Sequence, residues 1–433
     1  MSSFYESLPP AELDAEIARL EEEAAAVKAC GLKLNMARGK PSPDQLELSL
    51  PILATLAPDS DLTDGGIDCR NYGCIEGIPS ARALFGEMLG VGADNVLIGG
   101  ESSLTLMYDA LAHAMVHGVC GCEPFMLQMQ REPLTWICLT PGYDRHFGIA
   151  EQFGFKLVAV PLTPEGPDMD VVEELVGDPT VKGMWCVPKY SNPSGVTYSD
   201  EAVRRVAALR PAAPDFRVYW DNAYCEHDLY PDRREVLLNV FEELERNQNP
   251  DLVYAFCSTS KITLAGAGVS AMAASKANLD DLLSEYRHRM IGHDKLNQLR
   301  HVRYLRDMEG LREHMALQAD VLRPRFELVD ERLRRGLGEL GVATWTKPLG
   351  GYFVSFDGPR GSARAIVELC KECGVTLTGA GATWPYGVDP EDTNIRIAPS
   401  FPSLGELDRA LDVFVTCVKL VSARLAREGR SRG

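Results

Sequence analysis

Short apolar runs alternate with segments of helical periodicity over most of this chain. Runs of strand length occupy residues 95–98, 135–139, 155–160, 184–187, 216–220 and 252–257. Helix-like patterns begin at Leu104 and cover 144–153 and 200–209. Strands that are apolar on both sides and alternate with helices are typical of a mostly parallel sheet covered on two faces. The pattern therefore predicts an α/β fold.

The two ends of the chain show different patterns. Residues 11–30 predict an amphipathic helix, and the chain after residue 275 becomes helical. Short strands are expected at 350–356, 375–377 and 394–398, with a helix at 361–372 and a final helix from Leu404. At 433 residues the chain exceeds the usual size of one core. We expect an N-terminal helix and arm (1–50) packing with a small α+β domain (316–433), beside a large domain (51–315).

The composition narrows the class of partner. A formal net charge of −18 argues against a nucleic acid or an anionic membrane as partner. No stretch approaches the ~20 apolar residues of a membrane span, and no secretory signal is apparent. The 12 cysteines are scattered, which suggests reduced thiols. We expect a cytoplasmic protein that binds small molecules.

Three close pairs of potential metal ligands carry little weight. They are Cys120/Cys122, Cys370/Cys373 and His113/His117. None has further ligands at a metal-binding spacing, so no metal site is predicted.

Residues suited to chemistry follow the ends of the predicted strands. They are Gly99/Gly100, Tyr143, Asn192, Asp221 and Ser258/Lys261. Because ligands of parallel sheets gather at the carboxyl ends of the strands, these residues are expected on one rim. Each also has an ordinary alternative role, such as a cap or a turn opener, but the set together favours one binding site.

The segment Ser258-Thr259-Ser260-Lys261 suggests the type of cofactor. A lysine beyond a buried strand can form a Schiff base with a carbonyl cofactor, and Ser258 can hold an anionic tail. Gly100, Glu101 and Ser102 open a helix whose free N–H groups suit the same anion. The side chain of Glu101 would repel a phosphate, so we expect it to turn away.

A pyridine cofactor with an aldehyde, a phenolic oxygen and a phosphate would find partners on this rim. Asp221 would pair with the ring nitrogen and keep it protonated. Asn192 and Tyr224 would hydrogen-bond to the phenolic oxygen, and Tyr143 would lie over the ring.

Several motifs resemble the fold-type-I pyridoxal-phosphate aminotransferases. They are Asn192-Pro193-Ser194-Gly195, Asp221-x-x-Tyr224, Ser258-x-x-Lys261 and Arg396. Longer segments are similar to a divergent bacterial subgroup of aspartate aminotransferases, and the similarity covers nearly the whole chain. These segments are Ala37-Arg38-Gly39-Lys40-Pro41-Ser42, Pro188-Lys189-Tyr190-Ser191-Asn192-Pro193, residues 260–268 and residues 396–402.

The resemblance implies a large domain with a seven-stranded type of sheet and a smaller α+β domain. It implies pyridoxal 5'-phosphate as cofactor, and an amino acid and a 2-oxo acid as substrates. The expected reaction converts L-aspartate and 2-oxoglutarate to oxaloacetate and L-glutamate by a ping-pong route. Other donors (an aromatic amino acid, alanine or 2-aminoadipate), a carbon–sulfur lyase and a transcriptional regulator with this fold are the alternatives.

Residue roles follow from the same resemblance. It implies a homodimer with shared active sites, in which Tyr72 reaches the neighbouring subunit's phosphate. Arg396 would bind the substrate α-carboxylate, assisted by Asn192 and the backbone near Gly39. Lys261 would move the substrate proton, with Asp221 and Tyr224 completing the catalytic set.

Two features depart from the usual family pattern. The arginine expected about eight residues after the lysine, which helps to bind phosphate, is replaced by Gly266-Ala267-Gly268-Val269. The residue that binds the distal carboxylate of a dicarboxylic substrate also has no motif. The candidates are Arg300 of the partner subunit, slightly ahead, then Arg303, Lys40 and Arg38.

Overall fold

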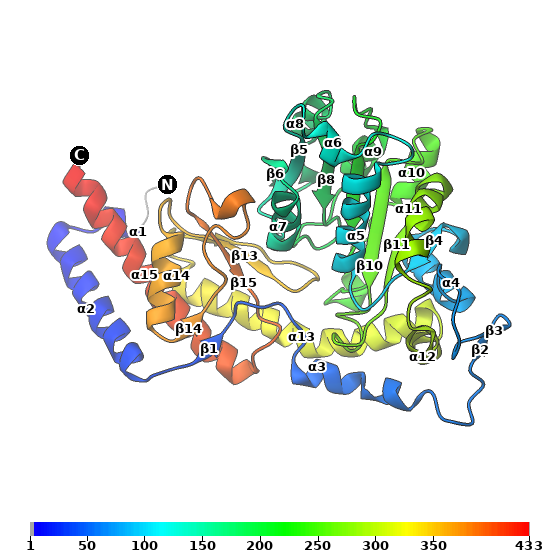
Figure 1. Cartoon of the computed structure of the whole chain (residues 1–433). Helices are drawn as coiled ribbons and strands as arrows, with labels where there is room; N and C mark the ends of the chain where they lie inside the picture. The colour runs from blue at the N-terminus through cyan, green and yellow to red at the C-terminus, as the bar shows by residue number, and fades with distance from the viewer. Residues whose placement is uncertain (1–3, 433) are drawn as a thin grey trace.

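Eight strands form the main sheet of the computed structural model, which describes residues 4–432 (Figure 1). The strand order is β4-β11-β10-β9-β8-β5-β6-β7. The neighbours from β10 through β6 are parallel, whereas β11 is antiparallel to both β10 and β4. The carboxyl ends of β4, β5, β8, β9 and β10 therefore meet at one edge. This confirms the α/β fold class, with the two-residue β7 as an added edge strand.

The strands of the main sheet are β4 (Val96–Ile98), β5 (Thr135–Thr140), β6 (Lys156–Thr163), β7 (Gly166–Pro167), β8 (Val181–Cys186), β9 (Arg217–Asp221), β10 (Val253–Ser258) and β11 (Ser270–Ala273). The helices around it are α4 (Pro79–Leu89), α5 (Ser103–His117), α6 (Phe125–Gln128), α7 (Asp144–Gln152), α8 (Met169–Leu175), α9 (Asp200–Ala208), α10 (Val240–Arg246), α11 (Lys276–Arg289) and α12 (Lys295–Leu305).

The remaining helices are α1 (Phe4–Ser7), α2 (Pro10–Ala29), α3 (Pro43–Leu48), α13 (Met308–Leu337), α14 (Ala363–Glu372) and α15 (Leu404–Arg432). The remaining strands are β1 (Leu34–Asn35), β2 (Thr63–Asp64), β3 (Ile67–Asp68), β12 (Thr344–Trp345), β13 (Val354–Asp357), β14 (Val375–Thr376) and β15 (Asn394–Ile397). Among residues 4–432, no helix has the length and apolar character needed to cross a membrane.

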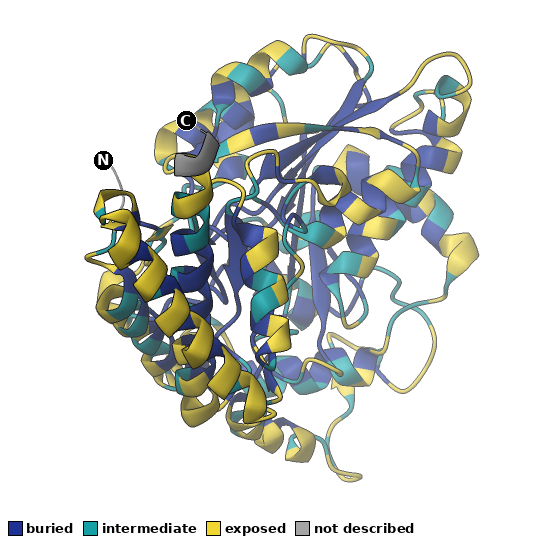
Figure 2. Ribbon diagram, turned by 90° about the vertical axis from the view of Figure 1, so that its left-hand side faces the viewer, coloured by how far each residue is buried: buried dark blue, intermediate teal, exposed yellow. Residues whose placement is uncertain are grey.

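Helices cover both faces of the main sheet, as the run of fully apolar strands predicts. Along β10, Val253, Ala255 and Cys257 pack into the core that contains α4 and α9. Tyr254 and Phe256 point to the opposite face and pack with α5 and α11. Figure 2 shows the strands as buried and the outer helices as exposed on their solvent side. Because successive side chains of a strand point to opposite faces of the sheet, the orientation of Asp221 is fixed by its position at the end of the neighbouring β9.

A second core joins the two ends of the chain. Leu13, Ile17 and Leu20 of α2 belong to it together with α14, α15 and β13, and α2 lies beside α15 in Figure 1. The long helix α13 contributes to both cores: its first half packs with the main sheet, and its residues from Leu322 onward pack in the second core. The helix α13 thus connects the two cores, and the domain division expected at 315/316 stays a prediction.

Besides several two-residue strands that were not predicted, two longer segments differ from the expected strands. The antiparallel strand β11 was not predicted, because its residues are small and carry little β preference. The strand expected at 350–356 begins only at Val354. A Cβ on Gly350 would lie 2.1 Å from the Tyr190 ring, and Gly351 has φ +81°. These glycines therefore serve a close chain approach and not a strand.

We predict that Gly183→Ala destabilises the protein. Gly183 lies inside β8, and a Cβ there would lie 2.3 Å from the indole of Trp136 in the buried sheet. Overpacking of this kind costs about 1–3 kcal/mol, measured as a lower midpoint of chemical denaturation. The control is Gly405→Ala, where a Cβ meets nothing within 4 Å. An unchanged midpoint for Gly183→Ala would show that the sheet adapts without cost.

Candidate active site

A cavity of about 510 Å³ opens at the carboxyl edge of the main sheet. It is lined by residues that follow β5, β8, β9 and β10, by the first turns of α5 and α7, and by residues of the second core. The side chains used below are those of Arg38, Ser102, Tyr143, Asp144, Arg145, Asn192, Asp221, Tyr224, Ser258, Ser260, Lys261, Phe353, Thr378 and Arg396. The cavity thus collects side chains from segments far apart in sequence.

Lys261 provides the amine of the cavity. Its Nζ lies 5.0 Å from the centroid of the Tyr224 ring and 5.9 Å from that of Tyr352. Desolvation lowers the pKa of Lys261, and the negative charge of Asp221 opposes this shift. The ring of His227 lies next to this lysine, with Nε2 3.4 Å from the Lys261 carbonyl oxygen, and burial and the charge of Lys261 lower the pKa of His227 to about 3. A lysine with a lowered pKa has more of the neutral, nucleophilic amine near neutral pH.

Asp221 is held by only one of its two oxygens. Its Oδ2 lies 3.1 Å from Nε2 of His146, whose ring stacks on Trp185 at 4.7 Å between centroids. Asp221 is 3% exposed, and its Oδ1 has no hydrogen-bond partner among the described residues. A buried carboxylate oxygen without a partner is costly. The cavity wall therefore offers a strong acceptor for a protonated nitrogen.

Arg396, on β15, also lines the cavity. Its NH1 donates to Asp144 Oδ1 at 3.0 Å and to Asn192 Oδ1 at 3.4 Å, and its NH2 donates to Thr378 Oγ1 at 3.3 Å. The guanidinium carbon lies 4.9 Å from the centroid of the Phe353 ring. These contacts hold the planar guanidinium, which can donate two parallel hydrogen bonds, in place, and Arg396 is only 8% exposed. Such a group is suited to binding a carboxylate.

Hydroxyl groups gather at the start of α5. Ser102 caps this helix and accepts a bond from the backbone N–H of Leu104. Ser258 donates to Ser260 at 3.1 Å, and Ser260 donates to the carbonyl oxygen of Glu101 at 2.7 Å. Hydroxyls beside a helix start suit an anion.

The segment that lacks the expected arginine runs close to the start of α5 at Gly268. A Cβ on Gly268 would lie 3.0 Å from the Glu101 carbonyl oxygen and 3.2 Å from the Ser260 backbone nitrogen. The chain therefore passes close to Glu101 and Ser260 at Gly268, so a side chain at this position would require its neighbours to shift. Among the described residues that line the cavity, no cation comes from residues 266–269.

Most of the predicted site residues come together in this cavity. Those that line it are Gly39, Ser102, Tyr143, Asn192, Asp221, Tyr224, Ser258, Lys261 and Arg396. Gly100 and Glu101 do not line it, although the Glu101 carbonyl oxygen contacts Ser260. Tyr72, 83% exposed, and Arg300 also lie outside it. Their expected roles across a subunit boundary stay predictions.

The sequence patterns missed other residues of the cavity. These are Asp144, Arg145, Ser260, Phe353 and Thr378, together with His146, which does not line the cavity but contacts Asp221. Asp144, Arg145 and His146 form the first turn of α7, where they looked like ordinary helix residues. The signal available was their position directly after Tyr143 at a strand end.

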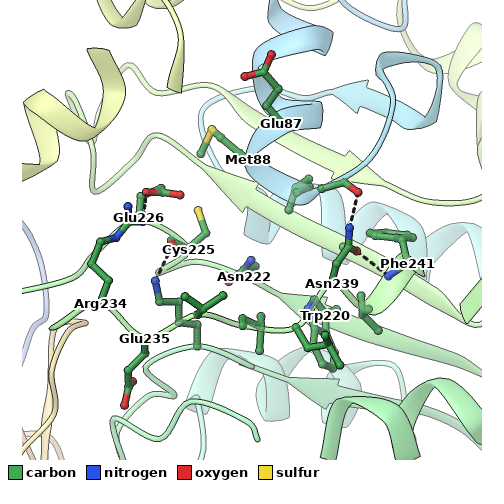
Figure 3. A pocket seen from close by; sticks show the side chains of 18 of the residues that line it. Glu87, Met88, Trp220, Asn222, Cys225, Glu226, Arg234, Glu235, Asn239 and Phe241 are labelled. Atoms are coloured by element: carbon green, nitrogen blue, oxygen red, sulfur yellow. Dashed lines mark hydrogen bonds and ion pairs between the residues drawn. The ribbon is translucent and has the colours of Figure 1, made fainter. Parts of the chain in front are cut away.

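A second cavity, of about 340 Å³, is lined by residues of α4, β9 and α10 (Figure 3). Its charged side chains neutralise one another: Arg234 donates to Glu226 at 2.7 Å and Arg312 to the same carboxylate at 3.2 Å. Lys189 donates to the Cys225 carbonyl oxygen at 2.9 Å. Because its cations are already paired, this cavity is a weaker candidate for an anionic ligand than the first.

The close histidine pair contacts carboxylates of the protein, and Cys370 and Cys373 are free thiols. His113 lies 3.0 Å from Asp281, and His117 lies 3.4 Å from Glu285. Cys370 and Cys373 are buried in the second core. Within residues 4–432, no group of three or more His, Cys, Asp or Glu side chains is placed to hold a metal ion.

Comparisons with known proteins confirm the similarity expected from the motifs. Residues 8–429 match the family model described as aspartate amino-transferase. An aspartate aminotransferase from Corynebacterium glutamicum is 45% identical over 92% of this chain and 91% of its own. A crystal structure of an aspartate transaminase from the same species has a TM-score of 0.94 at 42% identity, covering 98% of this chain and 100% of that one. A 2-aminoadipate transaminase from Thermus thermophilus is 26% identical over 82% of each chain.

Burial and the charge of Asp221 have opposite effects on the pKa of Lys261, and this predicts how the reactivity of Lys261 depends on pH. Because the charge of Asp221 raises the pKa of Lys261 against the effect of burial, Asp221→Asn should lower that pKa further. The neutral amine then persists to lower pH, so Lys261 should be acylated faster in the variant at a given pH below its pKa. The measurement is the pH profile of Lys261 acetylation in cofactor-free protein, followed by peptide mass spectrometry.

The control for this measurement is Asp170→Asn. Asp170 pairs with Arg205 on the surface at 2.6 Å and does not line the cavity. A profile for Asp221→Asn that stays in place or moves to higher pH would contradict the coupling.

Proposed function

The chain belongs to the aspartate aminotransferase family and is a transaminase, and we propose that it transfers the amino group of L-aspartate to 2-oxoglutarate. The proposed route is ping-pong, with pyridoxal 5'-phosphate as the cofactor. One observation carries the proposal: the amine of Lys261, the unpartnered oxygen of Asp221 and the guanidinium of Arg396 line the same cavity.

The residues present fit this cofactor. The free Oδ1 of Asp221 suits a protonated pyridine nitrogen, and the buried His146 holds the other oxygen in place. The α5 start with Ser102, Ser258 and Ser260 would receive the phosphate. When bound, the cofactor supplies an electron-withdrawing ring that stabilises negative charge at the substrate Cα.

Protein groups would perform the other steps. Arg396 and Asn192 would bind the α-carboxylate and orient the Cα–H bond toward Lys261. The neutral Nζ of Lys261 would then accept the Cα proton and return it, as a base with a lowered pKa can do near neutral pH. Burial raises the pKa of Tyr224 well above its ordinary value, so its hydroxyl stays a hydrogen-bond donor.

We propose that Arg145 binds the distal carboxylate of the substrate. Arg38 lines the same cavity and is the second candidate. Both guanidinium groups line the cavity, and no ion pair joins either of them to a described residue. Arg145 also follows Asp144, which contacts Arg396 directly. Arg300 instead donates to Asn297, Arg303 bonds to the Asp61 carbonyl oxygen, and Lys40 lies 3.9 Å from the centroid of the Phe401 ring. The prediction for Arg300 of the partner subunit stays the alternative to this assignment.

A longer dicarboxylic donor, 2-aminoadipate, is the second candidate. It is supported by the relative of that name and by the exposed position of Arg38 and Arg145, which leaves room for a longer chain. Comparing rates with L-aspartate and 2-aminoadipate separates the two.

We also propose a homodimer that shares its active sites. The Tyr72 ring is 83% exposed on a loop that is bonded to the start of α12, where Lys295 donates to the Gly73 carbonyl oxygen at 2.9 Å. Ile291 and Leu296, near the same helix start, are also exposed. An apolar face at this loop is suited to covering by a second copy.

We predict that Lys261→Ala abolishes covalent attachment of the cofactor and lowers turnover by more than about a thousandfold, because both the nucleophile and the proton carrier are lost. The measurements are visible absorbance after adding pyridoxal phosphate, and peptide mass after borohydride reduction. Lys261→Arg, which keeps the charge, should behave like Lys261→Ala. Reduction that attaches the cofactor to another lysine in wild-type protein would contradict the assignment.

We predict that Arg145→Gln lowers kcat/KM for L-aspartate relative to L-alanine by about 10- to 100-fold, as expected for the loss of a hydrogen bond to a charged group. The matched variant is Arg300→Gln, which should leave this ratio within about twofold. The ratio comes from single-turnover conversion of each amino acid. A loss of aspartate preference in Arg300→Gln alone would return the distal site to the partner subunit.

A further inference from the structure

The guanidinium of Arg396 is already paired with a carboxylate of this chain. Asp144 Oδ1 accepts from NH1 at 3.0 Å, closer than the Asn192 contact on the same nitrogen at 3.4 Å. Asp144 is the first residue of α7 and lines the cavity. A substrate carboxylate that binds Arg396 would therefore meet a negative charge of the protein at the same donor.

The two partners of this ion pair differ in freedom. The side chain of Arg396 is 8% exposed and is also held by Thr378 and by the Phe353 ring, whereas the side chain of Asp144 is 35% exposed. Asp144 can therefore turn to solvent, while Arg396 stays in place. An exchange of carboxylates on Arg396 requires movement of Asp144 alone.

We propose that Asp144 competes with the substrate α-carboxylate for Arg396 and so sets the affinity of the site for all α-carboxylates. The proposal rests on the proposed function, in which Arg396 binds that carboxylate. Each ligand that enters exchanges one ion pair on Arg396 for another, and the net gain is smaller than for a free arginine. Asp144 is a positioning residue in this scheme, since it acts on the substrate through Arg396.

The loss of Asp144 and the loss of Arg145 should affect the affinities for monocarboxylates and dicarboxylates differently. Removing the charge of Asp144 should tighten the binding of a monocarboxylate and a dicarboxylate by the same factor, because both lose the same competitor. Removing Arg145 should weaken only the dicarboxylate. Cofactor affinity should change little on the loss of Asp144, because the hydroxyl groups proposed to receive the phosphate are those of Ser102, Ser258 and Ser260.

The experiment measures equilibrium binding of succinate and of propionate to the holoenzyme by isothermal titration calorimetry. Neither ligand carries an amino group, so binding is separated from turnover. Asp144→Asn and Asp144→Ser should each bind both ligands about two- to fivefold more tightly than wild type, as expected for loss of a partly exposed ion pair. Asp144→Glu should keep the wild-type affinity. With L-aspartate, the neutral variants should show a lower KM with little change in kcat.

The matched control is Asp200→Asn. Asp200 is likewise the first residue of a helix, α9, and pairs with Arg204 at 3.1 Å, but it does not line the cavity. Its variant should bind both ligands as wild type does.

The outcomes separate the two proposals. If wild type binds neither ligand, or Arg396→Lys binds them as wild type does, the substrate role of Arg396 fails and this inference fails with it. If wild type binds them through Arg396 but both neutral Asp144 variants bind equally or more weakly, the inference alone is overturned.

Discussion

The pairing of β9 with β10 is the constraint on which the site depends. The two strands are parallel neighbours, and their register places Asp221 beside Phe256. Ser258 ends β10 two residues later, and Lys261 follows in the next turn. The amine and the carboxylate are therefore brought to one wall by backbone hydrogen bonds of the sheet. This explains how the charge of Asp221 reaches Lys261 strongly enough to oppose the effect of burial on its pKa.

The strand ends and the start of α5 could be predicted from the sequence, whereas the role of the start of α7 could not. Apolar runs mark where a buried strand stops, so Asn192, Asp221 and Ser258 were identified by their positions. Asp144 and Arg145 carry no such mark, because charged residues are common in the first turn of any exposed helix. Thr378 was hidden for another reason: its contact with Arg396 joins segments whose approach depends on the packing of the second core. Periodicity describes one element at a time, and these contacts belong to pairs of elements.

The charges of the cavity differ from those of the whole molecule. The chain has a formal net charge of −18, yet the cationic side chains of Arg38, Lys40, Arg145 and Arg396 line this cavity against the carboxylates of Asp144 and Asp221. A local positive potential inside a negative molecule draws small anions to one place and discourages non-specific binding of polyanions. Dicarboxylic substrates and a phosphorylated cofactor are the ligands that this distribution favours.

The ion pair between Arg396 and Asp144 also joins the two cores. Arg396 lies on β15, which packs in the second core, whereas α7 packs against the main sheet. Asn192, which follows β8, adds a hydrogen bond from the main sheet to the same guanidinium, whereas Thr378 binds it from within the second core. A ligand that takes the place of Asp144 would hold Arg396 with one end and the residues of the sheet edge with the other. The ligand would then supply the link between the cores that Asp144 supplies in this structure, so that substrate binding and the relative position of the two cores depend on the same arginine.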